Sequence, residues 1–247
     1  MSDSQAKRLL IIGGSSAIAQ ALISTHVKMN DWCEIAIVSR SPAPQAFSDI
    51  NQNVAWHTVS EYSEEEIQSL VQQWKSANRR FNRVISTIGL LHDDKKQPEK
   101  KLEELNLSSF MHVMQVNAGV NAIWLSHAAN IVDRQHCQWV VFSARVGSIS
   151  DNRLGGWYSY RASKAALNML MKTASVEFKR RFKNASLVCY HPGTVDSPLS
   201  APFQTNVAPD KLFTPAFTAN RLVEILAGLS NDENLHYVDW DGQSITW

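Results

Sequence analysis

A tyrosine and a lysine four residues apart, Tyr160 and Lys164, are the pair in this sequence best suited to proton transfer. They stand in a stretch from Tyr158 to about Lys183 that is predicted to form a long helix, so their side chains would share one face and could meet. A free tyrosine has a pKa of roughly 10, and a neighbouring ammonium group lowers that pKa. The alternative is an amphipathic helix that carries a surface lysine, so the rest of the chain must decide between the two.

A glycine turn near the N-terminus points to a second kind of chemistry. Gly13 and Gly14 follow an apolar run at 8–12 and precede a predicted helix at 16–30. A strand, a glycine turn and a helix start in succession form a cradle in which backbone N–H groups and the helix dipole face a phosphate. An ordinary tight turn between strand and helix shows the same pattern, so this motif needs support from others.

Short apolar runs alternate with longer amphipathic ones along the chain. Strands are expected at 8–12, 33–38, 54–59, 84–88, 138–142, 186–190 and 235–240, and helices at 16–30, 63–77, 108–132, 158–183 and from Thr214-Pro215 onward. Ser63 with Glu66 three residues later is a capping box at one helix start. This alternation predicts an α/β, doubly wound fold with a mainly parallel sheet of about seven strands covered on both faces. No linker interrupts it, so residues 1–247 are interpreted as a single domain.

The composition excludes some classes of function. The chain has 247 residues, 44% of them hydrophobic, which is enough to bury one large core. Lys and Arg total 24 against 23 Asp and Glu, a formal net charge of +1 that gives no indication of nucleic-acid or membrane binding. Cys33, Cys137 and Cys189 lack metal-ligand spacing, and no metal is assigned. The apolar run at 9–12 is too short for a signal peptide, so a cytoplasmic location is expected by elimination.

Several motifs occur together in a fixed order along the chain. They are the turn at Gly13, Ser86-Thr87-Ile88-Gly89, Val116-Asn117-Ala118-Gly119, Tyr160 with Lys164, and His191-Pro192-Gly193-Thr194. As a set they resemble a short-chain dehydrogenase/reductase over essentially the whole chain, which implies a Rossmann-type fold and hydride transfer with a nicotinamide cofactor. The segment 145–152 and the ending Trp240-Asp241-Gly242 with Trp247 resemble the C-factor (C-signal) branch of that family.

The resemblance implies roles for individual residues. Tyr160 would protonate the substrate oxygen as hydride arrives, and Lys164 would lower the pKa of Tyr160 and bind the nicotinamide ribose. Asn117 would hold Lys164 through a water molecule, although an asparagine that marks a helix kink is an alternative reading. Cofactor contacts are implied at Gly13, Ser15, Ser16, Ile18, Thr87, Gly89, Asn117, Tyr160, Lys164, Pro192, Gly193, Thr194, Val195 and Ser197.

One departure from the family pattern lies in the nucleotide loop. Ala17 and Ala19 stand where the family usually has glycines. Their methyl groups crowd the approach of a pyrophosphate and the packing of helix on strand, because glycine alone leaves that space empty. We expect cofactor binding to survive this change but to be weaker.

A second departure concerns the family's active-site serine, which lies three residues before a glycine. Counting back from Gly147 places Ala144 there, and Ser143 is one residue earlier. Strand alternation would turn the Ser143 hydroxyl to the other face unless a local bulge brings it back. Ser143 is kept as the third candidate catalytic residue, with Ser148 as a substitute; a hydroxyl bonded to nearby backbone is the alternative. Loss of one such donor slows a reaction by roughly a hundredfold to a thousandfold.

The end of the second strand and a late loop bear on cofactor and substrate. Ser39 and Arg40 suit the 2′-phosphate of NADP, whereas a carboxylate there would bind the ribose of NAD, so NADPH is favoured and NAD stays open. The loop at 197–213 is expected to close over the substrate. Its apolar residues, together with Trp157, suggest a hydrophobic carbonyl or alcohol compound, or ordinary packing.

Two functions therefore remain. The first is an NADPH-dependent oxidoreductase that reduces a small-molecule carbonyl, or oxidises the alcohol, with Tyr160 as acid/base. The second is a nucleotide-binding protein with weak or no catalysis, acting in signalling or cofactor sensing, which Ala17, Ala19 and Ala144 favour. Family members usually pair through the helices expected at 108–132 and 158–183, so a homodimer or homotetramer is expected.

Overall fold

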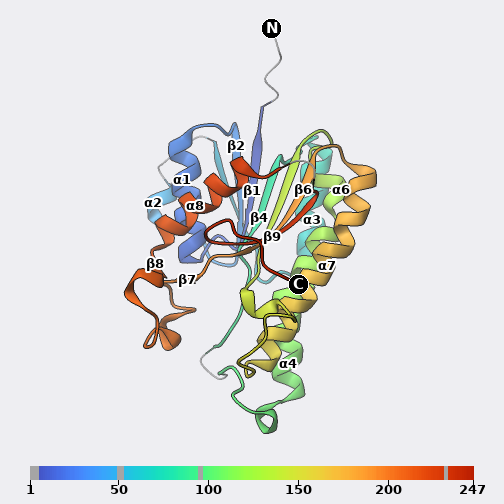
Figure 1. Cartoon of the computed structure of the whole chain (residues 1–247). Helices are drawn as coiled ribbons and strands as arrows, with labels where there is room; N and C mark the ends of the chain where they lie inside the picture. The colour runs from blue at the N-terminus through green and yellow to red at the C-terminus, as the bar shows by residue number, and fades with distance from the viewer. Residues whose placement is uncertain (1–5, 49–52, 94–96, 231–232) are drawn as a thin grey trace.

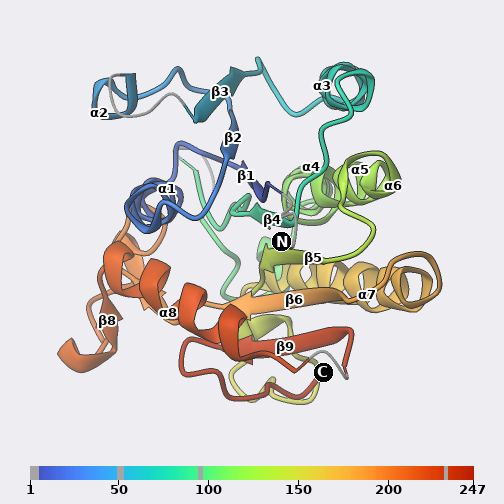
Figure 2. The same ribbon diagram turned by 90° about the horizontal axis from the view of Figure 1, so that it is seen from above.

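The central sheet is parallel and seven-stranded, in the order β3-β2-β1-β4-β5-β6-β9 (Figure 2). The computed structural model describes residues 6–48, 53–93, 97–230 and 233–247. The strands are β1 (Arg8–Ile12), β2 (Glu34–Ser39), β3 (Val54–Thr58), β4 (Arg83–Ser86), β5 (Cys137–Phe142), β6 (Ala185–His191) and β9 (Leu235–Asp239), with a separate short pair, β7 (Thr194–Val195) and β8 (Leu212–Phe213). The α-helices are α1 (Ala17–Met29), α2 (Gln45–Ser48), α3 (Glu64–Ser76), α4 (Leu107–Met114), α5 (Val120–Ser126), α6 (Ala128–Ile131), α7 (Tyr158–Arg181) and α8 (Pro215–Gly228). The predicted doubly wound fold is confirmed.

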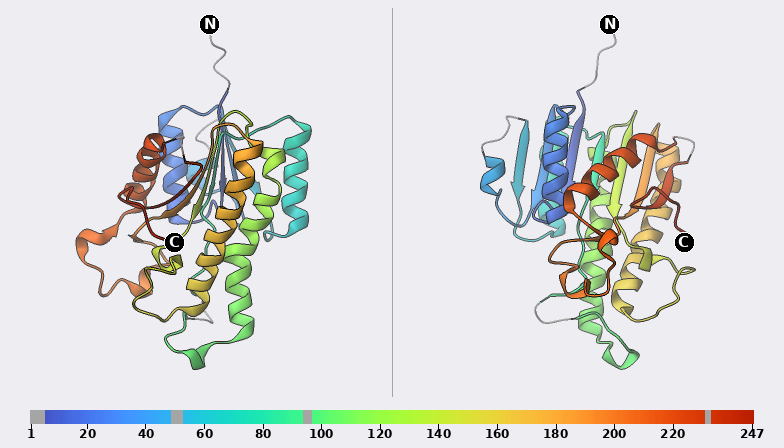
Figure 3. Two further views of the ribbon diagram at one scale, coloured as in Figure 1. Left: turned by 45° about the vertical axis from the view of Figure 1, so that its right-hand side comes forward. Right: turned by 60° about the vertical axis from the view of Figure 1, so that its left-hand side comes forward.

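Helices cover both faces of the sheet. In Figure 1 α1 and α8 lie on one side, and α3, α6 and α7 lie on the other. The strands run downward in this view, so their carboxyl ends form the lower edge, where the 197–213 loop and the start of α7 also lie (Figure 3). The strand order reverses between β1 and β4. Ligands of doubly wound sheets bind at the carboxyl edge near such a reversal.

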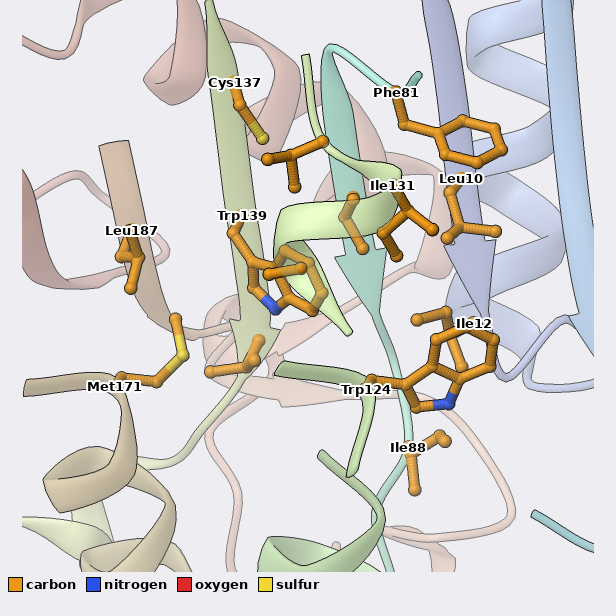
Figure 4. Packing of buried hydrophobic residues seen from close by; sticks show 14 of the residues in the cluster. Leu10, Ile12, Phe81, Ile88, Trp124, Ile131, Cys137, Trp139, Met171 and Leu187 are labelled. Carbon is orange, nitrogen blue, oxygen red and sulfur yellow. The ribbon is translucent and has the colours of Figure 1, made fainter. Parts of the chain in front are cut away.

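The core consists of two apolar layers, one on each face of the sheet. Leu10 and Ile12 point into the layer under α7, where Trp124 and Trp139 also pack (Figure 4). Leu9 and Ile11 point into the layer under α1 and α8. Because both faces are covered, β1 reads as a continuous apolar run and not as an alternating one.

Local sequence signals set the helix starts. The Ser16 hydroxyl accepts a hydrogen bond from the Ala19 amide at 3.1 Å, and the Thr214 hydroxyl accepts one from Phe217 at 3.1 Å. Half of the capping box predicted at Ser63 and Glu66 is found. The Ser63 hydroxyl accepts from the Glu66 amide at 3.3 Å, but the Glu66 carboxylate accepts from the amides of Ser60 and Glu61. The three hydroxyl oxygens satisfy amides that the first helical turn leaves without intrahelical partners.

The helix predicted at 108–132 is found over nearly the same range, but it is not one regular α-helix. The structure divides it into α4, a π-helical turn at Gln115–Gly119, α5 and α6. Asn117 lies in the π turn, and its side chain bonds to the backbone of Leu90 in the loop after β4. That long-range contact widens the helix locally, which the apolar periodicity does not reveal. Within the described residues, no helix is long and apolar enough to span a bilayer.

Candidate active site

The turn after β1 is held tightly by the ends of two neighbouring strands. Both Gly13 and Gly14 donate their amides to the Val38 carbonyl at the end of β2, at 2.9 and 3.1 Å. Gly13 has a φ of +98°, and a Cβ atom there would lie 2.6 Å from Oγ1 of Thr87, which follows β4. Glycine is therefore required at this turn, for both its backbone angle and the space it leaves.

The start of α1 offers amide groups to an anion. Ser16 caps the Ala19 amide, and its hydroxyl donates to Thr87 Oγ1 at 3.3 Å. The amides of Ala17 and Ile18 belong to the first turn, so no preceding turn of the helix accepts from them. Ala19 is buried in the core, so its methyl group packs against the sheet without displacing the helix. The cradle therefore fits a phosphate-bearing cofactor despite the two alanines.

The end of β2 presents one exposed cation. Ser39 is buried, and its hydroxyl accepts from the Ser41 amide at 3.2 Å. Arg40 next to it is exposed. Tyr62 packs nearby, donating its hydroxyl to Val38 O at 3.4 Å, and burial raises the pKa of Tyr62 to about 12. Of the two residues predicted for cofactor choice, Arg40 is the one available to an anionic group.

Lys164 lies beneath Tyr160 in the first turns of α7. Its Nζ atom donates to the Phe142 carbonyl at the end of β5, at 2.7 Å, and lies 5.7 Å from the centroid of the Tyr160 ring. The lysine is 2% exposed. Burial lowers the pKa of Lys164 to about 8, opposed by Cys189. The predicted meeting of the two side chains is found, but the ammonium faces the ring and a carbonyl.

Tyr160 differs from expectation in its ionisation. Burial, and then Tyr237 nearby, raise the pKa of Tyr160 above its usual value. Lys164 was expected to lower this pKa, but its ammonium is bonded to Phe142 O. Among the described residues nothing hydrogen-bonds to the Tyr160 hydroxyl, and Tyr160 borders a cavity of about 270 Å³. Tyr160 is therefore a protonated phenol whose O–H group is not committed to a hydrogen bond with the described residues.

Asn117 joins the loop after β4 to α7. Its Oδ1 atom accepts from the Leu90 amide at 2.6 Å, and its Nδ2 atom donates to Leu90 O and to Ser163 Oγ, both at 2.8 Å. A Cβ atom on Gly89 would lie 3.4 Å from Lys164 Nζ and 3.8 Å from Asn117 Oδ1, so these three predicted residues converge. Asn117 therefore marks a helix distortion, which was one of the two expectations for it, and it also lies near Lys164, as the family resemblance implied.

The candidate serines do not reach Tyr160. Ser143 donates its hydroxyl to Asn168 Oδ1 on α7 at 2.6 Å, although Ser143 and Ala144 both border the same cavity as Tyr160. Ser148 accepts from the Asp151 amide at 3.1 Å within its own turn. In the described chain, no serine hydroxyl bonds to the Tyr160 phenol. A donor role for Ser143 stays a prediction.

The segment after β6 closes the other side of the cavity. Gly193 has a φ of +71°, and a Cβ atom there would lie 2.6 Å from the Phe213 ring, so only glycine fits. Ser197 donates its hydroxyl to Val195 O at 3.2 Å. Pro192, Gly193, Thr194, Val195 and Ser197 all line the cavity, as does Ile18 of α1. The start of α1 and Tyr160 therefore border the same cavity.

Trp157 and Phe203 line the cavity, and Phe203 also contacts His92 from a third segment. The Phe203 ring of the 197–213 loop lies 5.0 Å from the Trp157 ring and 5.6 Å from the His92 ring. His92 Nε2 also hydrogen-bonds with Leu199 O at 3.0 Å. The contact of the loop with His92 was missed, because nothing in the sequence marks two segments about 110 residues apart as neighbours.

His191 and Arg145 also border the cavity and were not among the predicted site residues. Burial, and then Arg145, lower the pKa of His191 to about 4, so the ring is neutral near pH 7. Arg145 pairs with Asp239 at 2.8 Å. His191 stands in the His-Pro-Gly-Thr motif, which is a signal that could have drawn attention to it.

Comparisons with known proteins agree with this geometry. The family model described as short chain dehydrogenase matches residues 7–208. The chain belongs to that family. It is 31% identical to C-signal of Myxococcus xanthus over 105 residues, which are 42% of this chain and 58% of C-signal. It is also 31% identical to 1-hydroxy-2-glutathionyl-2-methyl-3-butene dehydrogenase of Rhodococcus sp. (strain AD45), over 43% of this chain and 45% of that protein. The chain thus spans about half the length of these curated relatives.

A solved structure resembles the whole chain. It is the NADPH-bound carbonyl reductase from chicken fatty liver, which has a TM-score of 0.85. The likeness covers 98% of this chain and 99% of that protein, at 17% sequence identity. At that identity the similarity establishes the fold alone. The resemblance inferred from the motifs is confirmed at the level of the family.

Proposed function

We propose that this protein is an NADPH-dependent oxidoreductase that reduces a carbonyl compound, or oxidises the corresponding alcohol. The observation that carries the proposal is the Tyr160 phenol, protonated and without a hydrogen-bond partner among the described residues, over the buried Lys164 and at the edge of a cavity. A phenol so placed can give its proton to an oxygen that enters the cavity. The likeness to the chicken carbonyl reductase, which holds NADPH, supports the same reading.

The residues present suit the cofactor. The free amides at the start of α1 would hold a pyrophosphate, Arg40 would hold a 2′-phosphate, and Lys164 would hold the nicotinamide ribose. The chemistry that NADPH supplies when bound is a hydride for the carbonyl carbon. Tyr160 donates its proton to the carbonyl oxygen, so that the substrate leaves as a neutral alcohol. The ammonium of Lys164, although bonded to Phe142 O, lies 5.7 Å from the Tyr160 ring centroid and would offset part of the negative charge of the phenolate that Tyr160 becomes.

The cavity indicates the kind of substrate. Its wall is largely apolar, with Leu91, Trp157, Leu199 and Phe203 around the space beside Tyr160. Burial of an apolar group against these side chains would supply binding energy and exclude water from the reacting carbonyl. A small hydrophobic aldehyde or ketone fits best.

One observation favours a second function. No serine hydroxyl in the described chain reaches Tyr160, and Ala144 occupies the position of the family serine. Loss of one donor from an oxyanion site costs roughly a hundredfold to a thousandfold in rate. A protein that binds the nucleotide but turns over slowly, as a sensor of cofactor state or in signalling, is therefore the alternative.

The experiment that separates the two is a titration followed by turnover. NADPH and NADH are titrated by fluorescence, and consumption of the bound cofactor is then measured with a panel of hydrophobic aldehydes and ketones. We expect tighter binding of NADPH and measurable reduction. Tyr160→Phe should keep NADPH binding within about twofold and lose reduction by about a thousandfold, because general acid catalysis contributes on that order.

Tyr158→Phe is the matched control, since Tyr158 is a neighbouring tyrosine of α7 that does not line the cavity. It should leave both quantities unchanged. Binding of NADPH without reduction of any carbonyl would favour the sensor. Failure to bind either nucleotide would contradict both functions.

A further inference from the structure

The helix that carries Tyr160 begins without a cap of its own. The residue before its first turn, Trp157, has a left-handed φ of +52° and makes no side-chain capping bond. The two residues before it are also left-handed, Gly155 at +65° and Gly156 at +66°. A bulky aromatic residue in this conformation is a strained outlier that the surrounding contacts must maintain.

A carboxylate from a distant segment completes this helix start. Glu99 accepts a hydrogen bond from the Ser159 amide at 3.1 Å with one oxygen, and from the Ser159 hydroxyl with the other. The carbonyl oxygen of Glu99 accepts from the Trp157 amide. A negative charge is favoured at a helix N-terminus, where it meets both the free amides and the positive end of the helix dipole.

The burial of Glu99 is unusual for an acid. It is 6% exposed, and within the described residues its carboxylate has no cationic partner. Removing a carboxylate from water is unfavourable unless hydrogen bonds replace the lost hydration. Here the first turn of α7 supplies them. Both carboxylate oxygens of Glu99 are thus engaged by Ser159.

A second set of contacts holds the left-handed residues 155–157 that lead into α7. Arg161 donates from Nε to Gly156 O at 2.9 Å and from Nη2 to Gly155 O at 3.1 Å. The left-handed entry is therefore fixed twice, once by a side chain of the helix itself and once by Glu99. Of these two sets of contacts, those of Glu99 are the ones that tie residues 157–159 to a distant segment of the chain.

The contacts of Glu99 lie directly beside the proposed catalytic group. Ser159 precedes Tyr160 in the chain, and Glu99, Ser159 and Tyr160 border one small cavity of about 20 Å³. Trp157, which Glu99 holds by its amide, lies 6.2 Å from the Tyr160 ring and forms part of the substrate wall. We infer that Glu99 is a positioning residue for Tyr160, acting through the first turn of α7. This inference rests on the proposed reductase function for its effect on rate.

The test compares Glu99→Ala with Glu66→Ala. Glu66 is also a carboxylate near a helix start, accepting from the Ser60 amide at 2.7 Å and the Glu61 amide at 3.1 Å, but it lies at α3, outside the site. Glu99→Ala should lower kcat about tenfold to a hundredfold, since a displacement of about 1 Å has an effect of that order. The Kd for NADPH should stay within about twofold. Glu66→Ala should leave both values unchanged.

Two further variants separate charge from hydrogen bonding. Glu99→Gln keeps an acceptor for the Ser159 amide and should retain more activity than Glu99→Ala. Ser159→Ala removes only the hydroxyl partner, so it should lower kcat less, and it should add little to Glu99→Ala in the double variant. A loss of kcat in Glu99→Ala no larger than in Glu66→Ala would overturn the inference.

A readout independent of activity keeps the inference separate from the proposed function. Hydrogen–deuterium exchange of peptides from 157–164 should speed up at least about tenfold in Glu99→Ala and stay unchanged in Glu66→Ala. If the wild-type protein reduces no carbonyl but this exchange pattern is found, the reductase proposal fails and the positioning of Tyr160 by Glu99 stands. Unchanged exchange in Glu99→Ala would contradict the positioning role whatever the activity.

Discussion

Two helices, α1 and α7, begin at the carboxyl edge of the sheet, and their first turns are completed in different ways. At α1 a local serine, Ser16, caps one amide and leaves the amides of the first turn facing outward. At α7 the protein's own carboxylate, Glu99, fills the corresponding space from a distance of 60 residues in sequence. An open helix start is suited to bind an anion from solution, whereas a filled one serves as a fixed support.

The largest expected effect comes from distorting the glycine turn that leads into the open start of α1. Gly13→Ala places a Cβ atom 2.6 Å from Thr87 Oγ1 and imposes a side chain on a φ of +98°. The Kd for NADPH should rise at least about a hundredfold, and the free energy of unfolding should fall by about 1–2 kcal/mol. Fluorescence titration and chemical denaturation measure the two quantities.

Gly242→Ala is the matched control, because Gly242 has a φ of +80° but a Cβ atom there would make only an ordinary contact of 3.6 Å with Ile225. It should lose some stability from the backbone strain alone, less than Gly13→Ala loses, and keep its affinity for NADPH. Equal affinities in the two variants would show that the turn at Gly13 does not contribute to cofactor binding.

A smaller effect, of opposite sign, should follow from giving Tyr160 a hydroxyl partner. Ala144→Ser adds a hydroxyl beside the cavity, at the position of the family serine, and should raise kcat about tenfold. Ser143→Ala should change kcat by less than about threefold, because the Ser143 hydroxyl is bonded to Asn168. Steady-state kinetics with the best carbonyl of the panel checks both. A large loss in Ser143→Ala with no gain in Ala144→Ser would instead identify Ser143 as the donor.

The smallest effect is a pH dependence that arises at the filled start. Burial lowers the pKa of Lys164 to about 8, so the ammonium is present below pH 8 and is lost as the pH rises. The pKa of Tyr160 is raised, so the phenol keeps its proton over this range. The value of kcat/KM, which reports the free enzyme, should therefore fall about fourfold by pH 8.5.

Lys164→Arg should abolish this alkaline decrease, because a guanidinium stays charged, although its overall rate will be lower. A wild-type profile that is flat to pH 10 would show that the charge of Lys164 does not matter for the reaction. The measurement is the pH profile of kcat/KM from pH 6 to 10 for both proteins.

Much of the fold follows from local signals. The strand predicted at 8–12 has the bounds that the structure shows, and Ser63 and Thr214 cap helices where expected. These features depend on neighbouring residues and on burial of both faces of the sheet, which the apolar runs record directly. The convergence of Gly89, Asn117 and Lys164 followed from the family resemblance, since spacing alone does not bring them together.

The errors concern long-range contacts. The helix at 108–132 contains a π turn where Asn117 bonds to Leu90. The pKa of Tyr160 is raised by burial and by Tyr237, and the ammonium of Lys164 is bonded to Phe142 O. The role of Glu99 was not foreseen for the same reason. Each of these depends on which residue a distant segment brings into hydrogen-bonding range, and no periodicity encodes that.

The completion of α7 by Glu99 also has a consequence for how the protein folds. A helix start that needs a partner 60 residues away forms only after the intervening chain, with β5, has been ordered. The body of α7 is able to form from local contacts, but the turn that bears Tyr160 belongs to the late, long-range steps. By the same reasoning this turn is among the first to open on heating, so inactivation should precede global unfolding.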